Sequence, residues 1–543
     1  MTLVAYLRRP AFAVTLAVLC GSLFGQSPRA AYGSEAAGYY RIAGVLVNGS
    51  TGEPIRRGVV QALNDAGRVV ASSTTDDDGS FALDHLTAAK YQLAASKHGF
   101  RVQSYDEHDE FASSIVTGPN LDTTHINFKL TPNAVLYGTV TDDDGDPVEN
   151  ARVMLFKRPK FPGAGERITQ VNAATTDDTG AYEFGDIGPG EYLMAVAAEP
   201  WYAVHSSTTA RNNALDVAFP VTYFDSTTDE QAATPVELAG GMHQEANISM
   251  HAVPALHISV PAQRRSEENT GVGAELQQIV FGSMVGVTGN YNYTSNPGNL
   301  TMDGVTPGHY QLVMHGDPDR VVDLALSSNQ QIDPGSASSA GAVAGKVRMA
   351  GGSPMAEELT VSLERTDDGP GQNQLAAEAH QGRFRLDSVP PGEYAVSVIA
   401  GDKSMPVIAI ATGEMKKAGN LITIRDRTPE LIVTVGEGEV RVEGFAEKDG
   451  QGFAGAMMVL LPKNTALWKS LTRRDQSDSD GSFAFREVAP GEYTAIAVEQ
   501  GWALNWTSPA AMARFLPRGT NVTVTGNAGK LVRLSSAVMV QQR

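Results

Sequence analysis

Five segments of the chain repeat one pattern of apolar and polar positions. Each begins with a Gly, has apolar residues two, four and seven positions later, and reaches a Tyr twelve positions after the Gly. The segments are Gly79–Tyr91, Gly180–Tyr192, Gly298–Tyr310, Gly382–Tyr394 and Gly481–Tyr493. Apolar residues spaced by two lie on one face of a β-strand. The pattern therefore predicts a strand, a turn and a second strand, repeated five times at intervals of 84 to 118 residues.

The turn inside the repeat carries its own signal. Four copies have Pro-Gly immediately before the residue that precedes the Tyr, as in Pro189-Gly190-Glu191-Tyr192. Pro presets the first central position of a type II turn, and Gly supplies the positive φ of the second. We expect the Tyr ring in the core with its hydroxyl bonded to nearby backbone, as in the tyrosine corner of other sandwiches.

A second pattern marks the start of most repeats. A strand, a Gly-containing hairpin turn and a strand entered by Pro occur in residues 42–55, 136–148 and 343–355. The fifth copy has Gly452 in place of the Pro, and the third begins directly with the strand 256–260. About 100 residues per repeat is the usual size of one sandwich domain. The predicted fold is all-β, a tandem array of about five Ig-size antiparallel β-sandwiches at 38–132, 133–254, 255–329 (a degenerate copy), 343–428 and 429–543, with a linker at 330–342.

The first thirty residues predict a signal peptide. Arg8 and Arg9 precede an apolar run from Ala11 to Gly25 that is too short to span a membrane. Cleavage is expected between Gly25 and Ala31, and an uncleaved anchor is the alternative because no A-x-A site is present. The only cysteine, Cys20, follows Leu19, which disfavours lipidation. A mature chain without cysteine suits an exported bacterial protein that is periplasmic, at the cell surface or extracellular.

Composition narrows the class of partner. The formal net charge is −19, and no run of Lys or Arg supplies the clustered positive field that nucleic acid requires. After the signal peptide no run of 18 apolar residues predicts a membrane span. The expected partners are therefore a polysaccharide or another envelope protein, and the oligomeric state stays open.

Two segments carry a family resemblance. Thr176–Tyr192 and Ser477–Tyr493 follow the pattern T/S-D-x-x-G-x-[FY]-x-[FL]-x-x-[LIV]-x-P-G-x-Y and resemble the carboxypeptidase regulatory-like domain. The resemblance covers the first, second, fourth and fifth repeats well and the third poorly. It implies a seven-stranded, transthyretin-like sandwich that accompanies peptidases, receptors and polysaccharide-handling proteins. It also implies kinship with starch-binding-like sandwiches, which keeps a sugar-binding role among the alternatives.

The sequence offers little to support catalysis. A zinc carboxypeptidase needs His and Glu at H-x-x-E spacing, but no His in the chain has Glu three residues later, and G-x-S-x-G is absent too. The G-x-G-x-x-G at Gly450–Gly455 falls where the other repeats have their first hairpin, so we interpret it as a turn and not as a dinucleotide site. We therefore expect no enzyme, no cofactor and no catalytic or metal residues.

Acidic turns and aromatic residues are the remaining candidates for binding. Asp-rich turns at 76–79, 142–146, 177–180 and 478–481 lack the leading Asp of an EF-like loop, which favours turn stabilisation, with calcium binding as the alternative. Trp201 and Trp502 stand nine residues after their repeat Tyr. With Tyr202 and Trp506 they form a candidate sugar-stacking set, and packing of the rings into the sandwich ends is the alternative.

Taken together, these patterns predict an exported, non-catalytic binding or spacer protein of tandem sandwich domains at the bacterial cell envelope. A carbohydrate-binding protein that uses exposed aromatics is the main alternative. An enzyme with residues brought together only by the fold is the third.

Overall fold

The computed structural model describes residues 39–543 apart from fifteen short stretches. Those stretches are 159–167, 206–213, 262–273, 287–289, 295–298, 315–319, 334–337, 340, 351–357, 367–373, 402, 414, 426–429, 437–439 and 526–530. The predicted signal peptide, residues 1–30, and the first residue of the third repeat, Gly298, lie outside the described residues.

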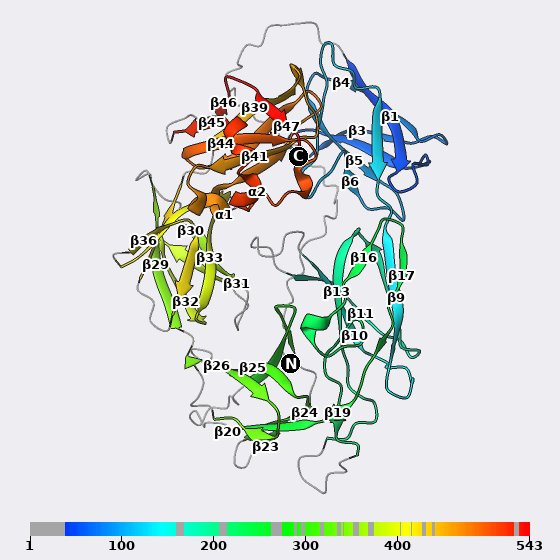
Figure 1. Ribbon diagram of the computed structural model, residues 1–543, viewed down its shortest axis with the longest axis vertical. Coiled ribbons are helices and arrows are strands. Elements are labelled where there is room, and N and C mark those ends of the chain that lie inside the picture. The colour runs from blue at the N-terminus through cyan, green and yellow to red at the C-terminus, as the bar shows by residue number, and fades with distance from the viewer. Residues whose placement is uncertain are drawn as a thin grey trace, which may run out of the picture. The chain divides into compact units, whose positions relative to one another are not determined.

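Strands make up nearly all of the regular structure, so the predicted all-β fold class is confirmed (Figure 1). The helical segments among the described residues are one turn long each. They are α1 (Trp468–Leu471), α2 (Pro509–Met512) and 3-10 turns at Glu230–Ala232, Thr465–Leu467, Gly501–Ala503 and Leu516–Arg518.

The first sandwich shows a two-sheet plan that the others repeat. In one sheet, β1 (Tyr40–Asn48) pairs antiparallel with β4 (Ser80–Leu86) and parallel with the last strand, β8 (Ile126–Leu130). In the other, the strands are β3 (Val69–Thr74), β2 (Val59–Leu63), β5 (Lys90–Ser96), β6 (Gln103–Ser104) and β7 (Ile115–Val116). The two strands of the repeat, β4 and β5, thus lie in opposite sheets, and the turn between them carries the chain across the core.

The second and third sandwiches follow the same plan. The strands of the second are β9 (Ala134–Thr141), β12 (Ala181–Ile187), β17 (His243–Glu245) and β18 (Ile248–Ser249), facing β10 (Arg152–Lys157), β11 (Thr169–Thr175), β13 (Gly190–Ala197), β15 (Thr222–Tyr223) and β16 (Val236–Leu238). A separate pair joins β14 (Val217–Ala218) to β19 (Val253–Pro254). The third has β20 (Leu256–Pro261), β23 (Asn290–Thr294), β24 (Asn299–Val305) and β27 (Gln330–Gln331), facing β21 (Ala274–Val280), β22 (Ser283–Gly286), β25 (Gly308–Met314), β26 (Arg320–Leu326) and β28 (Ser338–Ser339).

The fourth and fifth sandwiches keep the two-layer arrangement, but in each the layers are joined by strand pairing into a single sheet, of ten and nine strands. The fourth has β29 (Gly341–Met349), β32 (Arg383–Val389), β38 (Leu431–Val435), β35 (Val407–Thr412) and β36 (Met415–Ala418), with β30 (Glu358–Arg365), β31 (Gln374–His380), β33 (Gly392–Ala400), β34 (Lys403–Met405) and β37 (Leu421–Ile424). The fifth has β39 (Val440–Lys448), β40 (Gln451–Gly452), β43 (Ser482–Val488), β46 (Leu531–Arg533) and β47 (Val538–Gln541), with β41 (Met457–Pro462), β42 (Arg473–Gln476), β44 (Gly491–Val498) and β45 (Thr520–Val524). As predicted, Gly450–Gly455 is a turn region, where the β39–β40 hairpin forms.

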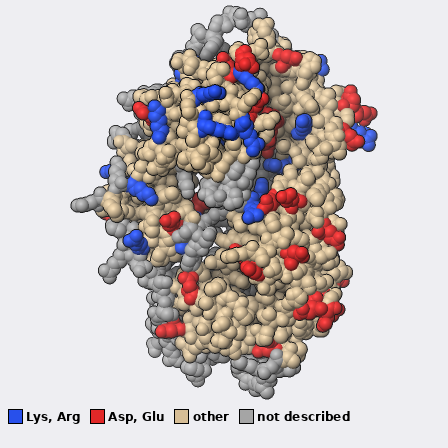
Figure 2. All heavy atoms as spheres, in the orientation of Figure 1, with Lys and Arg blue, Asp and Glu red and all other residues tan. Residues whose placement is uncertain are grey.

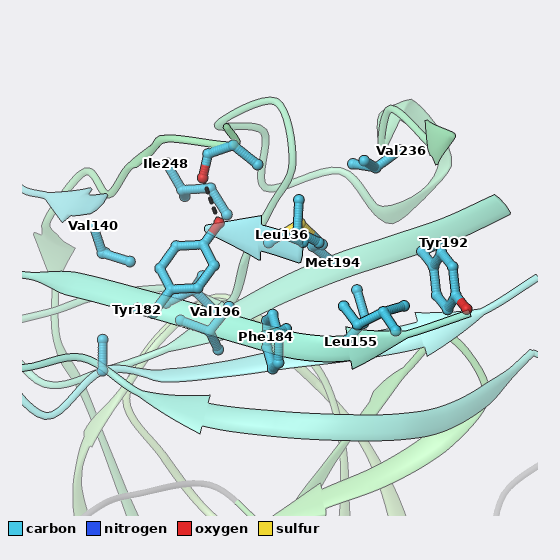
Figure 3. Close-up of a cluster of buried hydrophobic side chains, with 14 of the residues drawn as sticks. Leu136, Val140, Leu155, Tyr182, Phe184, Tyr192, Met194, Val196, Val236 and Ile248 are labelled. Carbon is cyan, nitrogen blue, oxygen red and sulfur yellow. Dashed lines mark hydrogen bonds between the residues drawn. The ribbon is translucent and has the colours of Figure 1, made fainter. Parts of the chain in front are cut away.

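Five clusters of buried apolar side chains fill the five sandwiches. Figure 3 shows the second, in which Phe184 and Leu155 from opposite sheets meet beside Tyr192. Every apolar residue and Tyr of the five repeats is at most 8% exposed. The predicted core positions are therefore confirmed.

A β-bulge explains the uneven spacing of the three apolar positions. The residue before the third apolar position is left-handed in four copies, with φ of 63° at His85, 56° at Asp186, 82° at Gly304 and 53° at Glu487. The register of β12 with β9 shifts at the same place. Because the bulge adds one residue to the strand, the next side chain returns to the core after three positions and not two.

The repeat Tyr behaves as the sequence predicts. Each hydroxyl bonds to the residue four positions earlier: Tyr91 to Thr87 O (3.1 Å), Tyr192 to Gly188 O (2.7 Å), Tyr310 to Thr306 Oγ1 (2.7 Å), Tyr394 to Pro390 O (2.8 Å) and Tyr493 to Ala489 O (2.8 Å). Burial raises the pKa of Tyr493 to about 12. The phenol therefore stays protonated and donates its hydrogen bond.

The Pro-Gly turn differs from the type II prediction. Gly190 has φ of +154°, far from the roughly +80° that a type II turn needs, and it opens strand β13. Space for a side chain is also tight at this position in two other copies. A Cβ on Gly308 would lie 3.3 Å from the ring of Tyr310, and one on Gly491 would lie 3.2 Å from the ring of Tyr493.

The last strand of a sandwich corrects two expected domain ends. We expected the fourth domain to end at 428, yet β38 pairs in parallel with β29 and its Leu431, Val433 and Val435 belong to the fourth core. Likewise β27 pairs in parallel with β20, and Ile332 packs in the third core, although residues 330–342 were expected to be a linker. The closing strand returns beside the first strand, so it belongs to the domain before it.

The second and fifth sandwiches have one sheet that is apolar on both faces. Strands β10 and β13 bury Met154, Phe156 and Leu193 on the face away from their own core, against Phe281 of the third sandwich. In the fifth, Met457 and Val459 of β41 are covered by a cluster that includes Trp502. In contrast, β5 of the first sandwich alternates buried and more exposed side chains.

Candidate functional site

The first and fifth sandwiches meet through residues that lie 363 to 394 positions apart in the chain. The first sandwich contributes Lys90 and the segment 106–116. The fifth contributes residues 474–479 with Trp502 and Trp506. We call this contact the clasp.

Hydrogen bonds made by the neighbouring residues orient the Asp478 side chain toward the outside of the fifth sandwich. Ser477 Oγ accepts from Ala456 N and donates to Phe453 O, which fixes the start of the turn. Asp480 Oδ1 accepts from Ser482 N at 2.9 Å and so satisfies the end of the turn. Asp478 Oδ1 is thereby left to accept a bond from another segment.

That other segment is the end of a first-sandwich loop. Ser114 N donates to Asp478 Oδ1 (2.8 Å), and Ser479 N donates to Ser114 O (3.0 Å). Val116 N then donates to Ser479 Oγ (2.8 Å). Backbone groups of an extended segment are thus paired as they would be by a neighbouring strand.

One ion pair accompanies these bonds. Lys90 Nζ lies 2.6 Å from Asp478 Oδ2, with the two side chains 30% and 10% exposed. Lys90 pairs with Val116 across β5 and β7, which places both residues beside the same turn. The ammonium group therefore faces the carboxylate whose other oxygen binds Ser114 N.

Gln476 is the polar centre of the clasp and is 1% exposed. Its Nε2 donates to Asp106 O (2.6 Å) and Ser113 Oγ (2.9 Å), and its Oε1 lies 3.1 Å from His108 Nδ1. Ser113 Oγ donates to Ser477 O (2.9 Å). A buried amide with this many partners fixes the orientation of the two surfaces.

An aromatic group flanks the polar centre. The His108 ring stacks on Trp502 with centroids 5.4 Å apart and an interplanar angle of 7°, and Phe111 stacks on Trp502 at 5.7 Å. The Arg474 guanidinium lies 4.4 Å from the centroid of Trp506 and 4.9 Å from that of Phe111. Arg474 also pairs with Asp109 at 3.1 Å.

The clasp residues are specific to their own copies of the repeat. The residue before the repeat Tyr is Lys90 in the first copy but Glu191, His309, Glu393 and Glu492 in the others. The residue five positions before the repeat Gly is Gln476 in the fifth copy but Thr74, Thr175 and Ala377 in the first, second and fourth. Each half of the clasp therefore carries side chains that the other copies lack at the same position.

A buried carboxylate lies next to the clasp. Asp475 Oδ2 accepts a bond from Ala484 N (2.6 Å) and so joins edge strand β42 to β43 of the facing sheet. The pKa of Asp475 is raised to about 6, mainly by burial and also by the nearby Asp478 carboxylate, whereas the bond from Ala484 N opposes the shift.

The structure places the four aromatic residues of the candidate stacking set differently. Trp502 is 6% exposed and lies inside the clasp, so its ring serves packing, the alternative to sugar stacking. Its ring is covered because the first sandwich and the α2 region enclose it. Trp506 is partly buried under Arg474.

The other two aromatics lie at the surface of the second sandwich. Trp201 is 82% exposed, and its ring meets Tyr202 edge-on with centroids 5.7 Å apart. Burial raises the pKa of Tyr202, and so does the negative charge of Asp142, Asp143 and Asp144. Exposed aromatic faces beside polar groups stack on sugars, and that role for Trp201 stays a prediction.

Two of the acidic turns use a carboxylate to accept backbone hydrogen bonds inside the turn. Asp177 Oδ1 accepts from Thr179 N and Ala181 N, both at 2.9 Å, and hydrogen bonds with Thr179 lower the pKa of Asp177. Asp142 Oδ1 accepts from Asp144 N and Asp146 N in the same way. Over the described part of the chain, no group of three or more His, Cys, Asp or Glu is arranged to hold a metal ion.

A buried His–Asp chain between the second and third sandwiches has no counterpart in the sequence analysis. His257 Nε2 lies 2.8 Å from Asp216 Oδ2, and its Nδ1 lies 2.6 Å from Asp303 Oδ1. His205 Nδ1 lies 3.1 Å from Asp216 Oδ1, beside a cavity of about 30 Å³. Burial opposes the shift, yet hydrogen bonds from both His lower the pKa of Asp216. No motif links these residues, so only the fold brings them together.

Comparison with known proteins identifies part of the chain. Residues 36–131 and residues 135–222 each match the model of the carboxypeptidase regulatory-like domain. The first two sandwiches are carboxypeptidase regulatory-like domains. The resemblance seen in Thr176–Tyr192 is thereby confirmed, since that segment lies within the second match. The remaining sandwiches share the two-layer strand arrangement described above.

More distant similarities add little. Colossin-A of Dictyostelium discoideum is 24% identical over an alignment of 495 positions that covers 81% of this chain and 4% of that protein, so this chain spans a small part of its length. A streptococcal ancillary pilin is 10% identical with a TM-score of 0.19, covering 55% of this chain and 98% of the pilin. The minor pilin GBS52 of Streptococcus agalactiae is 13% identical with a TM-score of 0.20, and the match covers 40% of this chain and 97% of the pilin. Scores this low carry no argument about function.

Charged side chains are unevenly distributed over the face drawn in Figure 2. Basic side chains gather in its upper part, with acidic ones among them, and acidic side chains predominate along its lower right. The expectation that the chain does not bind nucleic acid stays a prediction. Within the described residues, no helix has the length and apolar character needed to cross a membrane.

Proposed function

We propose that the chain is an exported, non-catalytic protein that works as a binding or spacer module at the bacterial cell envelope. The observation that carries this proposal is the clasp. The most elaborate polar site in the described residues is a contact between two domains of the chain, built from paired backbone groups, a buried amide and one ion pair. Such a site organises domains and performs no reaction.

Three sequence features support the cellular part of the proposal. The Arg8–Gly25 pattern is typical of an export signal, and the chain after it has no cysteine. Carboxypeptidase regulatory-like domains are accessory modules, and the peptidase motifs sought in the sequence are absent from it. The expected partners are another envelope protein or a polysaccharide.

A carbohydrate-binding role is the second candidate, because Trp201 is 82% exposed beside Tyr202. Exposed aromatic faces next to polar groups stack on sugars. Trp502 cannot serve this role while the clasp is closed.

Cell fractionation of the full chain, expressed with a carboxyl-terminal tag in a bacterium with two membranes, tests the location. We expect a chain outside the cytoplasm whose intact mass places its first residue between Gly25 and Ala31. A full-length chain that stays in the cytoplasm would contradict export.

A glycan array separates spacer from carbohydrate binder. Wild-type protein, Trp201→Ala and the control Phe445→Ala, which removes another exposed ring (51% exposed), are applied in parallel. The spacer role predicts no glycan signal that depends on Trp201. A signal that Trp201→Ala abolishes and Phe445→Ala retains would favour carbohydrate binding.

A further inference from the structure

The two halves of the clasp are different surfaces located on the first and last sandwiches of the chain. A contact between unlike surfaces is heterologous, and two unlike surfaces on one molecule can close on each other or join successive molecules head to tail. In this structure the contact is closed within one chain. Nothing in the chemistry of the contact requires both halves to belong to the same chain.

Each half of the clasp is complementary to the other half and not to the equivalent surfaces of the other repeats. Lys90 faces Asp478, whereas the equivalent residue of every other copy is Glu or His, which would not supply the same ammonium group. Gln476 reaches Asp106 and Ser113, whereas the equivalent Thr or Ala in three other copies is too short to do so. A first sandwich therefore fits a fifth sandwich better than it fits another first, second or fourth.

The polar groups of each clasp half can be hydrated when the two halves are apart. Most of the contact consists of groups that water can satisfy: the Lys90 ammonium, the Asp478 carboxylate, the Gln476 amide and the backbone of Ser114 and Val116. The apolar part centres on Phe111 and Trp502. Contacts between domains of one chain resemble transient protein–protein interfaces in this polar character.

We propose that the clasp also forms between copies of this chain, the fifth sandwich of one copy holding the first sandwich of the next. Within one chain the two halves meet at an effective concentration on the order of mM. Closure therefore dominates in dilute solution, and exchange dominates where copies are crowded or where closure is blocked. This inference concerns the molecule and does not depend on its cellular location.

Two variants, each defective in one half, test the proposal. Lys90→Glu places two carboxylates opposite each other and damages only the first-sandwich half. Asp478→Lys places two ammonium groups opposite each other and damages only the fifth-sandwich half. Alone, neither can close properly or self-associate through the clasp. Mixed, the intact fifth sandwich of the Lys90→Glu copy can hold the intact first sandwich of the other copy, so a discrete 1:1 complex forms.

The mass of the mixture is measured by size-exclusion chromatography with light scattering at tens of micromolar chain. We expect single-chain masses for each variant and a doubled mass for the mixture. Arg474→Glu, which alters the edge strand outside the turn, replaces Asp478→Lys if the latter unfolds. A mixture that stays at single-chain mass with both fifth-sandwich variants would overturn the proposal. Equal association of either variant with itself would overturn it too.

Discussion

At the scale of the residue, spacing alone identified the core but not the surface. The repeated apolar positions and Tyr are buried in all five copies, because a period of two and a fixed turn leave a side chain few alternatives. Trp201 and Trp502 share the same offset from their Tyr, yet one is 82% and the other 6% exposed. Their difference depends on which element covers each ring, and a repeat period contains no information about that.

The most direct residue-scale prediction concerns Phe483, which is 1% exposed. Phe483→Ala should lower the free energy of unfolding of the fifth sandwich by about 3–5 kcal/mol, since it leaves a cavity. Of the four Trp, Trp468, Trp502 and Trp506 lie in this sandwich, so tryptophan fluorescence in a Trp201→Phe background reports its denaturant unfolding. The adjacent ring of Phe445 is 51% exposed, and Phe445→Ala should change stability by less than about 0.5 kcal/mol. Equal losses for the two variants would contradict the core assignment.

At the scale of the element, strands were predictable and their roles were not. Edge strand β42 presents Arg474 and Gln476 to the first sandwich, opposite Val459 and Met457, while Asp475 lies between the sheets. The local sequence R-D-Q shows none of this, because the face each residue occupies is set by pairing with β41. An inward-pointing charge at an edge strand also discourages pairing with other chains.

Asp475 should make the stability of the fifth sandwich depend on pH. Its folded pKa of about 6 exceeds the ordinary value of 3.8, so between those values the folded state binds more protons than the unfolded state. Stability should therefore rise as pH falls from about 6 to 4, and the ionised carboxylate should disfavour folding above pH 6. Asp475→Asn can still accept the bond from Ala484 N and should stabilise this sandwich at pH 7 by up to about 2–3 kcal/mol.

The same fluorescence-detected unfolding, repeated from pH 4 to 7, measures this effect. Asp475→Asn should flatten the pH dependence, whereas Asp178→Asn at an exposed turn position should leave it unchanged. A steeper loss of stability on acidification in the wild type than in Asp475→Asn would show that the sign is wrong.

At the scale of the whole molecule, the number of sandwiches followed from the repeat, and the contacts between them did not. The closing strand β27 was assigned to a linker and β38 to the fifth sandwich, because residues 330–332 and 431–435 lack a repeat signal of their own. The clasp joins residues at least 363 positions apart, and five similar sandwiches offer many alternative pairs. Lys90 before the repeat Tyr, where three other copies have Glu, is the one local sign that the first sandwich has a different neighbour.

The last prediction is that Gln476 keeps the clasp closed. Gln476→Ala removes the amide that bonds Asp106 O and Ser113 Oγ, and leaving such groups unpaired costs about 1–3 kcal/mol. The ratio of open to closed chains should thus rise by roughly 5- to 150-fold, at 1.4 kcal/mol per factor of ten.

Because Cys20 is the only cysteine, Cys20→Ser allows spin labels to be attached at Val69→Cys in the first sandwich and Met539→Cys in the fifth, both about half exposed. Pulsed electron resonance should give one narrow distance in the parent and a broad, longer distribution in Gln476→Ala. Gln170→Ala, on exposed strand β11, is the matched control and should keep the narrow distance. A narrow, unshifted distance in Gln476→Ala would mean that the amide does not hold the two sandwiches together.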